Sequence, residues 1–337
     1  EQEHIISRLD PELKYQVKSS LNYPEDSAGR IMSRDFVSIP DNWTVREARQ
    51  YLLNNEELPD DFYTIFLVDE KTLKPTGEIA LDKLLRAKGD EKLNSIMDGE
   101  IVPVDVYTDQ EEVAHMFREY GWMSAMVVDN KGRLIGVINI DDVVEIVHEE
   151  TNEDMMLLTG AESNDVYRSV FSIFKSRSIW LVTNLFATIV AASVVGEFQD
   201  IIAQLSILAV LMPIVASMGG TTGQQTLAVV VRSLATKELN SRNALRMIGK
   251  EFMVGLCNGL LFAVMIGIAV RIWFPGQEMI SYIIALAMLC NLTVASLAGI
   301  LIPLTINRLK IDPAIASGVF LIACTDSGGY FIFLGLA

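Results

Sequence analysis

Five apolar segments fill the chain after residue 178, and each is long enough to cross a lipid bilayer. A helix of about 17 to 25 apolar residues spans the hydrocarbon core. Because lipid offers no partner for backbone N–H and C=O groups, such segments form helices. The sequence therefore predicts an all-α transmembrane domain of five helices, with spans at 179–196, 201–231, 252–274, 280–306 and 313–337.

The charge of the chain changes at the same point. Residues 1–178 hold 36 acidic and 19 basic side chains, whereas residues 179–337 hold 7 acidic and 8 basic ones. The first part is therefore predicted to be soluble and acidic, which argues against nucleic acid as a partner and suits a protein that collects cations. The three cysteines lie in the apolar segments and are predicted to be packing residues.

Basic residues predict how the spans face the two sides of the membrane. They gather before the first span, in the connection 232–250 and in the link 307–312, whereas the links 197–200 and 275–278 carry none. Because cytoplasmic loops carry the excess of lysine and arginine, the N-terminus is predicted to be cytoplasmic and the C-terminus outside. The chain is thus expected to be a multi-pass membrane protein.

Asp326 is an acidic side chain in the middle of the fifth span. A carboxylate at the centre of a bilayer costs about 3 kcal/mol or more unless it meets water, a cation or a polar partner. Such acids mark ion or proton pathways, so Asp326 is predicted to be a functional site. The alternative is a structural carboxylate that is hydrogen-bonded to Thr325, Ser327 or a neighbouring helix.

A second polar stretch, Gly-Gly-Thr-Thr-Gly-Gln-Gln-Thr at 219–226, lies inside the second span. Pro213 removes a helix donor ahead of it, and the glycines permit either a break in the helix or a close approach of two helices. Together with Asp326, this stretch predicts a polar pathway whose passenger is a cation. A kinked helix packed through small residues is the alternative.

Residues 31–148 contain an internal repeat, in which Ile31-Met32-Ser33 recurs as Ile96-Met97-Asp98. Each copy continues with a strand, an amphipathic helix, an apolar strand, and a last strand leading into a helix. These are expected at 36–40, 45–54, 64–69 and 77–85, and again at 101–104, 110–120, 125–129 and 136–144. Alternating strands and helices predict an α/β unit with a small sheet in each copy.

The segment 149–178 begins with closely spaced acids. Glu149 and Glu153 lie four residues apart, as do Glu150 and Asp154, so these side chains repel one another on a helix. A shared divalent cation would relieve the repulsion, whereas a solvated charged face is the alternative.

Helical spacing of Val166, Val170, Phe171 and Phe174 predicts an amphipathic helix on the membrane surface ahead of the first span. At the other end of the chain, residues 1–30 are expected to form two short helices broken at Pro11 and Pro24. These helices are too short to bury a core of their own.

These motifs together resemble the MgtE family of magnesium channels. The repeat resembles a tandem pair of CBS domains, most closely in VVDNKGRLIGVINIDDVVEIV of the second copy. Two further stretches carry the resemblance, PIVASMGGTTGQQTLAVVVRSLAT and DPAIASGVFLIACTDSGG, and it covers nearly the whole chain. The implied domains are a remnant of an N-terminal helical domain (1–30), two CBS motifs (31–90 and 91–148), an acidic connecting (plug) helix (149–178) and a transmembrane pore domain (179–337).

The resemblance implies a homodimer in the plasma (inner) membrane of a prokaryote, with Asp326 of both chains holding a hydrated Mg²⁺ in the pore. The implied pore-lining residues are Gly220, Gly223, Gln224, Thr226 and Gly318. Regulatory Mg²⁺ is implied at Asp109, Glu111, Asp142, Glu145, Glu150, Glu153 and Asp154, and the CBS pair is expected to bind ATP.

The chain departs from the family pattern at a few positions. Thr221 and Gln224 replace two asparagines of the glycine-rich patch, and Gly318-Val319 stands where a proline often follows the small residue. Both changes bear on ion selectivity. Gly121 occupies a position where the family can carry an acid, which bears on one regulatory site.

The function expected from these features is a Mg²⁺ or divalent-cation channel that cytoplasmic Mg²⁺ closes through the CBS and connecting-helix acids. An ion-coupled secondary transporter is the alternative. A third hypothesis is a membrane-anchored sensor that binds nucleotide near Thr108-Asp109 and Asp142. An enzyme is not expected, because the sequence lacks a recognisable nucleophile–base set or catalytic metal motif.

Overall fold

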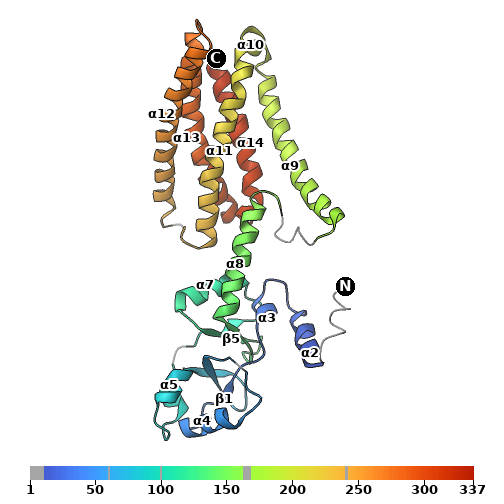
Figure 1. The fold of residues 1–337 in the computed structure, drawn as a ribbon, viewed down its shortest axis with the longest axis vertical. Coiled ribbons are helices and arrows are strands. Elements are labelled where there is room, and N and C mark those ends of the chain that lie inside the picture. Colours follow the sequence, from blue (N-terminus) through green and yellow to red (C-terminus); the bar gives the residue numbers. More distant parts are fainter. Residues whose placement is uncertain (1–10, 60, 99–100, 162–167, 240–241) are drawn as a thin grey trace. The chain divides into compact units, whose positions relative to one another are not determined.

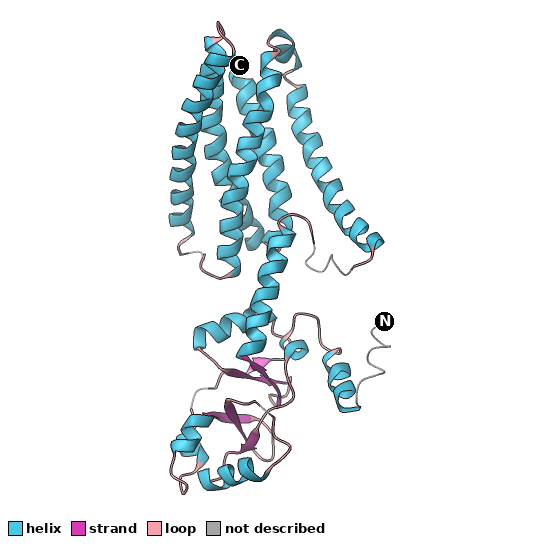
Figure 2. Cartoon of the chain, viewed as in Figure 1, coloured by secondary structure: helices cyan, strands magenta, loops and turns pink. Residues whose placement is uncertain are grey.

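The computed structural model describes residues 11–337 apart from positions 60, 99–100, 162–167 and 240–241. The chain forms two compact units, Glu1–Thr151 and Asn152–Ala337 (Figure 1). The first unit is α/β and the second is helical, as the sequence predicts (Figure 2).

The α/β unit contains two three-stranded sheets, one in each copy of the repeat. The sheets consist of β1 (Ser38–Pro40), β2 (Thr64–Val68) and β3 (Pro75–Ala80), and of β4 (Val104–Asp105), β5 (Ser124–Val128) and β6 (Leu134–Asn139). In each sheet the first strand pairs parallel with the second, and the second pairs antiparallel with the third. Both central strands shift register at the same place, between Leu67 and Val68 and between Val127 and Val128, so the internal repeat is confirmed in its strand pairing.

Local capping explains where one helix of each repeat begins. In α4 (Val45–Asn54), the Thr44 hydroxyl accepts from the Glu47 N–H while the Glu47 carboxylate accepts from the Thr44 N–H, which is a capping box. In α7 (Gln110–Tyr120), the Asp109 carboxylate accepts from the Glu111 N–H, and Gly121 ends the helix in the left-handed conformation. The other helices among the described residues of this unit are α2 (Pro11–Ser20), α3 (Ala28–Ile31), α5 (Leu81–Arg86), α6 (Leu93–Ile96) and most of α8 (Ile140–Leu157).

The segment ahead of the first repeat hydrogen-bonds to the second one. The Ala28 N–H donates to the Thr108 carbonyl (2.7 Å), and the Gly29 N–H donates to the Val106 carbonyl (2.8 Å). The core of the second repeat accordingly includes Ala28 and Met32. Of the two short helices expected in residues 1–30, α2 begins at Pro11, and a helix before that proline would lie outside the described residues.

The helical unit contains five helices that are long and apolar enough to cross a membrane, counted over the described residues. These are α9 (Val170–Gly196), α11 (Ile207–Ala235), α12 (Ala244–Trp273), α13 (Glu278–Arg308) and α14 (Pro313–Leu336), with a short helix α10 (Gln199–Gln204) between the first two. Helix α13 packs against α11, α12 and α14, whereas α9 packs against α14 (Figure 1). Of the five, α13 is the most buried.

Several helices differ from the expected boundaries: α12 begins at Ala244 rather than 252, and the span expected at 201–231 divides into α10 and α11. Three further differences concern the continuity of α8, α9 and α11. Helix α9 runs unbroken from Val170, so its described residues do not form a separate surface helix; Val166 lies outside them. Helix α11 continues through Pro213 and the glycines without a break, which leaves close helix approach as the role of Gly219 and Gly223. Helix α8 continues from the second CBS copy past residue 149, so the first acids of the connecting segment share a helix with that copy.

Candidate functional site: the polar residues of the helical unit

The polar stretch of α11 divides between two faces of the helix. Gly223 and Thr226 lie on a buried face, whereas Gln224 is exposed and Gly220 is half-buried. Ser217 and Thr221 are also exposed, and with 3.6 residues per turn they share the side of Gln224. The four α11 residues expected to line a pore therefore do not all face the same way within one protomer.

Glycine allows α11 to approach α14 closely. A Cβ atom at Gly223 would lie 2.9 Å from Cδ1 of Leu321 on α14. One turn away, Gly219 of α11 and Gly329 of α14 both border the amide of Asn291. Asp326 lies between Leu321 and Gly329 along α14, so its helical position is level with 219–223 of α11.

Asp326 is half-buried, and no hydrogen bond or ion pair to its carboxylate is found among the described residues. A structural role for Asp326 would need hydrogen bonds from Thr325, Ser327 or a neighbouring helix. Neither Thr325 nor Ser327 bonds to its carboxylate. The Thr325 hydroxyl donates to the carbonyls of Leu321 (3.0 Å) and Ile322 (3.2 Å) on its own helix. The buried Ser327 hydroxyl has no hydrogen-bond partner within the described part of the chain.

Asn291 on α13 is a polar side chain that the sequence interpretation did not single out. It is 1% exposed, and its Nδ2 donates to the Val215 carbonyl of α11 at 2.8 Å. Its Oδ1 is buried and lacks a partner among the residues that the structure covers. A single asparagine inside an apolar segment was the signal that could have revealed it, since polar groups in spans make interhelical bonds.

Gly318 of α14 lies beside the end of α8. A Cβ atom there would be 3.5 Å from the Leu158 carbonyl and 3.7 Å from the Trp180 ring of α9. Leu157 and Leu158 pack against a cluster that includes Leu227 of α11 and Leu321 of α14. The last turn of α8 is thus seated on the helices that carry the polar stretch and Asp326.

The acids expected to bind regulatory Mg²⁺ lie on α7 and α8 or cap them. Asp109 caps α7 and Glu111 lies in its first turn. Along α8 lie Asp142, Glu145, Glu150, Glu153 and Asp154. Among the described residues, no three metal-ligating side chains come together in a group that could hold a metal ion.

Glu150 and Asp142 each accept a hydrogen bond from a residue of the α/β unit. The Glu150 carboxylate accepts a hydrogen bond from the Gln110 side chain, whose amide also donates to Asp26 (3.4 Å). The Asp142 carboxylate is half-buried and accepts from the Asn139 N–H at 3.3 Å. Burial raises the pKa of Asp142 above its usual value, opposed by that hydrogen bond and assisted by the charges of Asp141 and Glu145.

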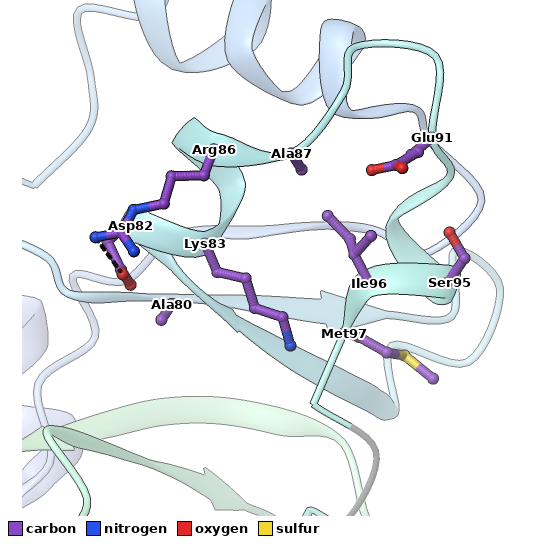
Figure 3. A pocket seen from close by; sticks show the side chains of 9 residues that line it. All are labelled: Ala80, Asp82, Lys83, Arg86, Ala87, Glu91, Ser95, Ile96 and Met97. Atoms are coloured by element: carbon purple, nitrogen blue, oxygen red, sulfur yellow. Dashed lines mark ion pairs between the residues drawn. The ribbon is translucent and has the colours of Figure 1, made fainter.

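A shallow pocket on the first repeat is lined by residues of α5 and α6 (Figure 3). Three of its four charged side chains form ion pairs, and the fourth, Glu91, accepts a hydrogen bond from the Lys88 N–H. Arg86 lies 3.5 Å from Asp82, and Lys83 lies 2.6 Å from Asp98. These exposed ion pairs leave the pocket without a converging set of binding groups, so it is not the candidate site.

The comparisons with known proteins cover both units. The MgtE family model, described as a divalent cation transporter, matches residues 212–336, and the CBS domain model matches residues 28–90 and 93–149. The chain is 33% identical to the magnesium transporter MgtE of Enterococcus faecalis over 96% of this chain and 71% of that protein. It is 30% identical to the magnesium transporter MgtE of Bacillus subtilis over 98% of this chain and 73% of that one.

Among solved structures, the cytosolic domain of the Mg²⁺ channel MgtE in complex with ATP is similar to part of the chain. The identity is 33% and the TM-score 0.40, over 43% of this chain and 58% of that structure's chain.

Proposed function

This chain belongs to the MgtE family, and we propose that it conducts Mg²⁺ through its helical unit and that cytoplasmic Mg²⁺ closes the path. The proposed location is the plasma (inner) membrane of a prokaryote, with the N-terminus cytoplasmic and the C-terminus outside. The observation that carries the proposal concerns the Asp326 carboxylate. Asp326 lies on a membrane helix, and its carboxylate forms no hydrogen bond or ion pair with any described residue. A carboxylate in that setting needs water or a cation to compensate its charge.

The exposed polar face of α11 supports a pathway that two copies of the chain complete. Ser217, Thr221 and Gln224 would face lipid if one protomer stood alone in the bilayer. Polar groups in lipid are costly unless they are satisfied within protein or line a water-filled cavity. In a homodimer with the two α11 polar faces and the two Asp326 side chains on a common axis, that cost disappears.

The chemistry of Mg²⁺ suits such a path. Mg²⁺ prefers six oxygen ligands and gives up its waters reluctantly. Two Asp326 carboxylates would supply charge, while the Gly220 carbonyl and the Gln224 amide would contact the ion's water shell. We propose that the wall of the pathway behind these groups is formed by Gly223, Thr226 and Gly318.

Closure is proposed to work through α8, which carries acids along its length and ends against the pathway helices. Leu157, the last residue of α8, and Leu158 just after it pack on α11 and α14. The acids Glu145, Glu150, Glu153 and Asp154 precede them on α8. Mg²⁺ bound among these acids and Asp109, Glu111 and Asp142 would reduce their mutual repulsion and hold α8 in place. The ion must bind the closed state more tightly than the open one, since otherwise it shifts no equilibrium.

ATP is proposed as a ligand of the CBS pair, with Thr108-Asp109 and Asp142 as the candidate contacts to its ribose. Binding of ATP would add a second cytoplasmic signal to the same helix α8. An ion-coupled transporter remains the second candidate function, because an unpartnered acid such as Asp326 can also carry a proton.

Flux into liposomes tests the function. The full-length protein is reconstituted, and uptake of Mg²⁺, Mn²⁺ and Co²⁺ is followed while Mg²⁺ on the side of the α/β unit is varied. We expect passive Mg²⁺ flux that persists when ionophores collapse H⁺ and Na⁺ gradients and that falls as Mg²⁺ on that side rises. Flux that requires one of those gradients would establish the coupled transporter instead. No flux under either condition would contradict both.

A further inference from the structure

Glu251 is a buried acid of the helical unit that the pathway described above does not use. It lies on α12 and is 9% exposed. Its Oε2 accepts a hydrogen bond from the Thr226 hydroxyl of α11, 2.9 Å away. Within the described residues its carboxylate forms no ion pair, so this hydroxyl is the partner that the structure provides. The sequence interpretation missed Glu251 because the apolar run begins one residue later, at Phe252.

The bond to Glu251 distinguishes Thr226 from the other hydroxyls of α11. Thr221 and Thr222 donate to the carbonyls of Ser217 (2.8 Å) and Met218 (2.9 Å), four residues earlier on the same helix. This local bond is the usual partner of a threonine inside a helix. Thr226 instead reaches across to α12, so its side-chain orientation is set by a neighbouring helix.

A third helix holds Thr226 from another side. A Cβ atom at Gly299 of α13 would lie 2.8 Å from Cβ of Thr226 and 2.7 Å from the Gly223 carbonyl. Because Gly299 has no side chain, α13 packs directly against α11 at this level and holds it close to α12. Packing against α13 and the hydrogen bond to α12 together leave α11 little freedom to rotate about its axis.

We infer that Glu251 is a positioning residue, which sets the rotation of α11 through Thr226 and thereby the place of Gln224 on the cation pathway. Gln224 and Thr226 are two residues apart, so they project from nearly opposite sides of the helix. When the hydrogen bond between Thr226 and Glu251 is lost, α11 can rotate about its axis. Its polar face, which carries Gln224, then turns through the same angle. This inference rests on the proposed function, since it assigns a consequence for the passing ion.

The test compares ion preference with stability in full-length protein reconstituted in liposomes. Four variants are made, Glu251→Ala, Glu251→Gln, Thr226→Val and the double variant Glu251→Ala/Thr226→Val. The measurements are the ratio of Mg²⁺ to Mn²⁺ flux and the thermal melting temperature. Thr222→Val is the matched control, because it removes a neighbouring buried hydroxyl whose bond stays within α11.

We expect Glu251→Ala and Thr226→Val to change the flux ratio in the same direction, by about tenfold. A tenfold change corresponds to roughly the free energy of one hydrogen bond to a charged group. The double variant should match either single variant, because both remove the same bond. Glu251→Gln should stay near the wild type, since its amide oxygen still accepts from Thr226. Thr222→Val should keep the wild-type ratio.

Two results would overturn the inference while wild-type flux persists. If Glu251→Gln were as defective as Glu251→Ala and Thr226→Val were normal, the charge of Glu251 would act on the ion directly. If the melting temperature fell without any change in the flux ratio, Glu251 would serve packing alone. Absence of wild-type flux is a different outcome, since it contradicts the proposed function and removes the inference with it.

Discussion

The side-chain amide of Asn291 on α13 donates to the Val215 carbonyl of α11 at 2.8 Å, in the interior of the helical unit. The same amide borders Gly219 of α11 and Gly329 of α14. One polar side chain therefore joins three helices at the level of the candidate pathway. Because Asn291 is 1% exposed, any side chain added beside it must displace it.

Alanine substitutions at two adjacent glycines of α11 are expected to have different effects. A Cβ atom at Gly219 would overlap the Asn291 amide, whereas a Cβ at Gly220 would have no atom of the described residues within 4 Å. Gly219→Ala should therefore lower the free energy of unfolding by about 1–3 kcal/mol, the usual cost of overpacking. Gly220→Ala should leave stability unchanged and alter flux, since that position is proposed to face the ion. Thermal melting and liposome flux on both variants check this, and equal stability of the two would contradict the packing argument.

Shortening Leu158 at the end of α8 should weaken closure by Mg²⁺. Leu158 is half-buried within the helical unit, where it packs beside α11 and α14. Leu158→Ala should therefore remove about 1 kcal/mol of apolar contact, which forms when the end of α8 lies against these two helices. The Mg²⁺ concentration that halves the flux should then rise several-fold, because the closed state alone loses the contact. Met155→Ala is the control, since Met155 lies three residues earlier, in the last turn of α8, and is 61% exposed. An unchanged closing concentration in Leu158→Ala would argue against the seat of α8 as the gate.

The parts of the fold that follow from local chemistry were predictable from the sequence. The helices Val45–Asn54 and Gln110–Tyr120 have the expected bounds, because a capping residue precedes each and Gly121 ends the second. The five spans were likewise predictable, since apolar length alone determines them. Local signals of this kind act within a few residues of where they occur.

The remaining features of the candidate site depend on which helices become neighbours. The pairing of Glu251 with Thr226, and of Asn291 with Val215, joins residues 25 and 76 positions apart. Periodicity within one segment carries no signal for such contacts. The glycines of α11 illustrate the limit, because sequence alone allowed either a break or a close approach, and packing against Asn291 and Leu321 decided between them.

Asp129 should make the stability of the α/β unit depend on acidity. Hydrogen bonds from the Arg133 side chain and backbone lower the pKa of Asp129 from 3.8 to about 2. Because the pKa in the folded protein is the lower one, the stabilisation is present above about pH 4 and is lost as the pH falls toward 2. Asp129→Asn should therefore melt at a lower temperature than the wild type at pH 7, with the difference shrinking at pH 3. Tryptophan fluorescence of the full-length protein measures both.

The control for that prediction is another acidic side chain of the same unit. Asp90 pairs with Arg46 at 2.6 Å, but the two side chains are 89% and 72% exposed, and exposed ion pairs contribute little. Asp90→Asn should melt like the wild type at both pH values. A loss at pH 7 as large as that of Asp129→Asn would indicate a general effect of net charge rather than the Arg133 bonds.

Asp326→Asn separates a residue that serves the ion from one that serves the fold. The substitution keeps the side-chain volume and removes the charge. If Asp326 attracts a divalent ion, Mg²⁺ flux should fall by about tenfold or more, because a unit charge facing a cation near 4 Å contributes from about 1 kcal/mol in water to several in protein surroundings. The melting temperature should stay the same or rise, because the carboxylate has no hydrogen-bond or ion-pair partner among the described residues and an unpartnered charge in a membrane helix is destabilising.

A structural carboxylate would give the reverse pattern, with a lower melting temperature and flux reduced only in proportion to the folded protein. Flux per folded protein and thermal melting, measured on the same preparation, decide between the two roles, and Asp326→Glu tests whether charge alone restores conduction.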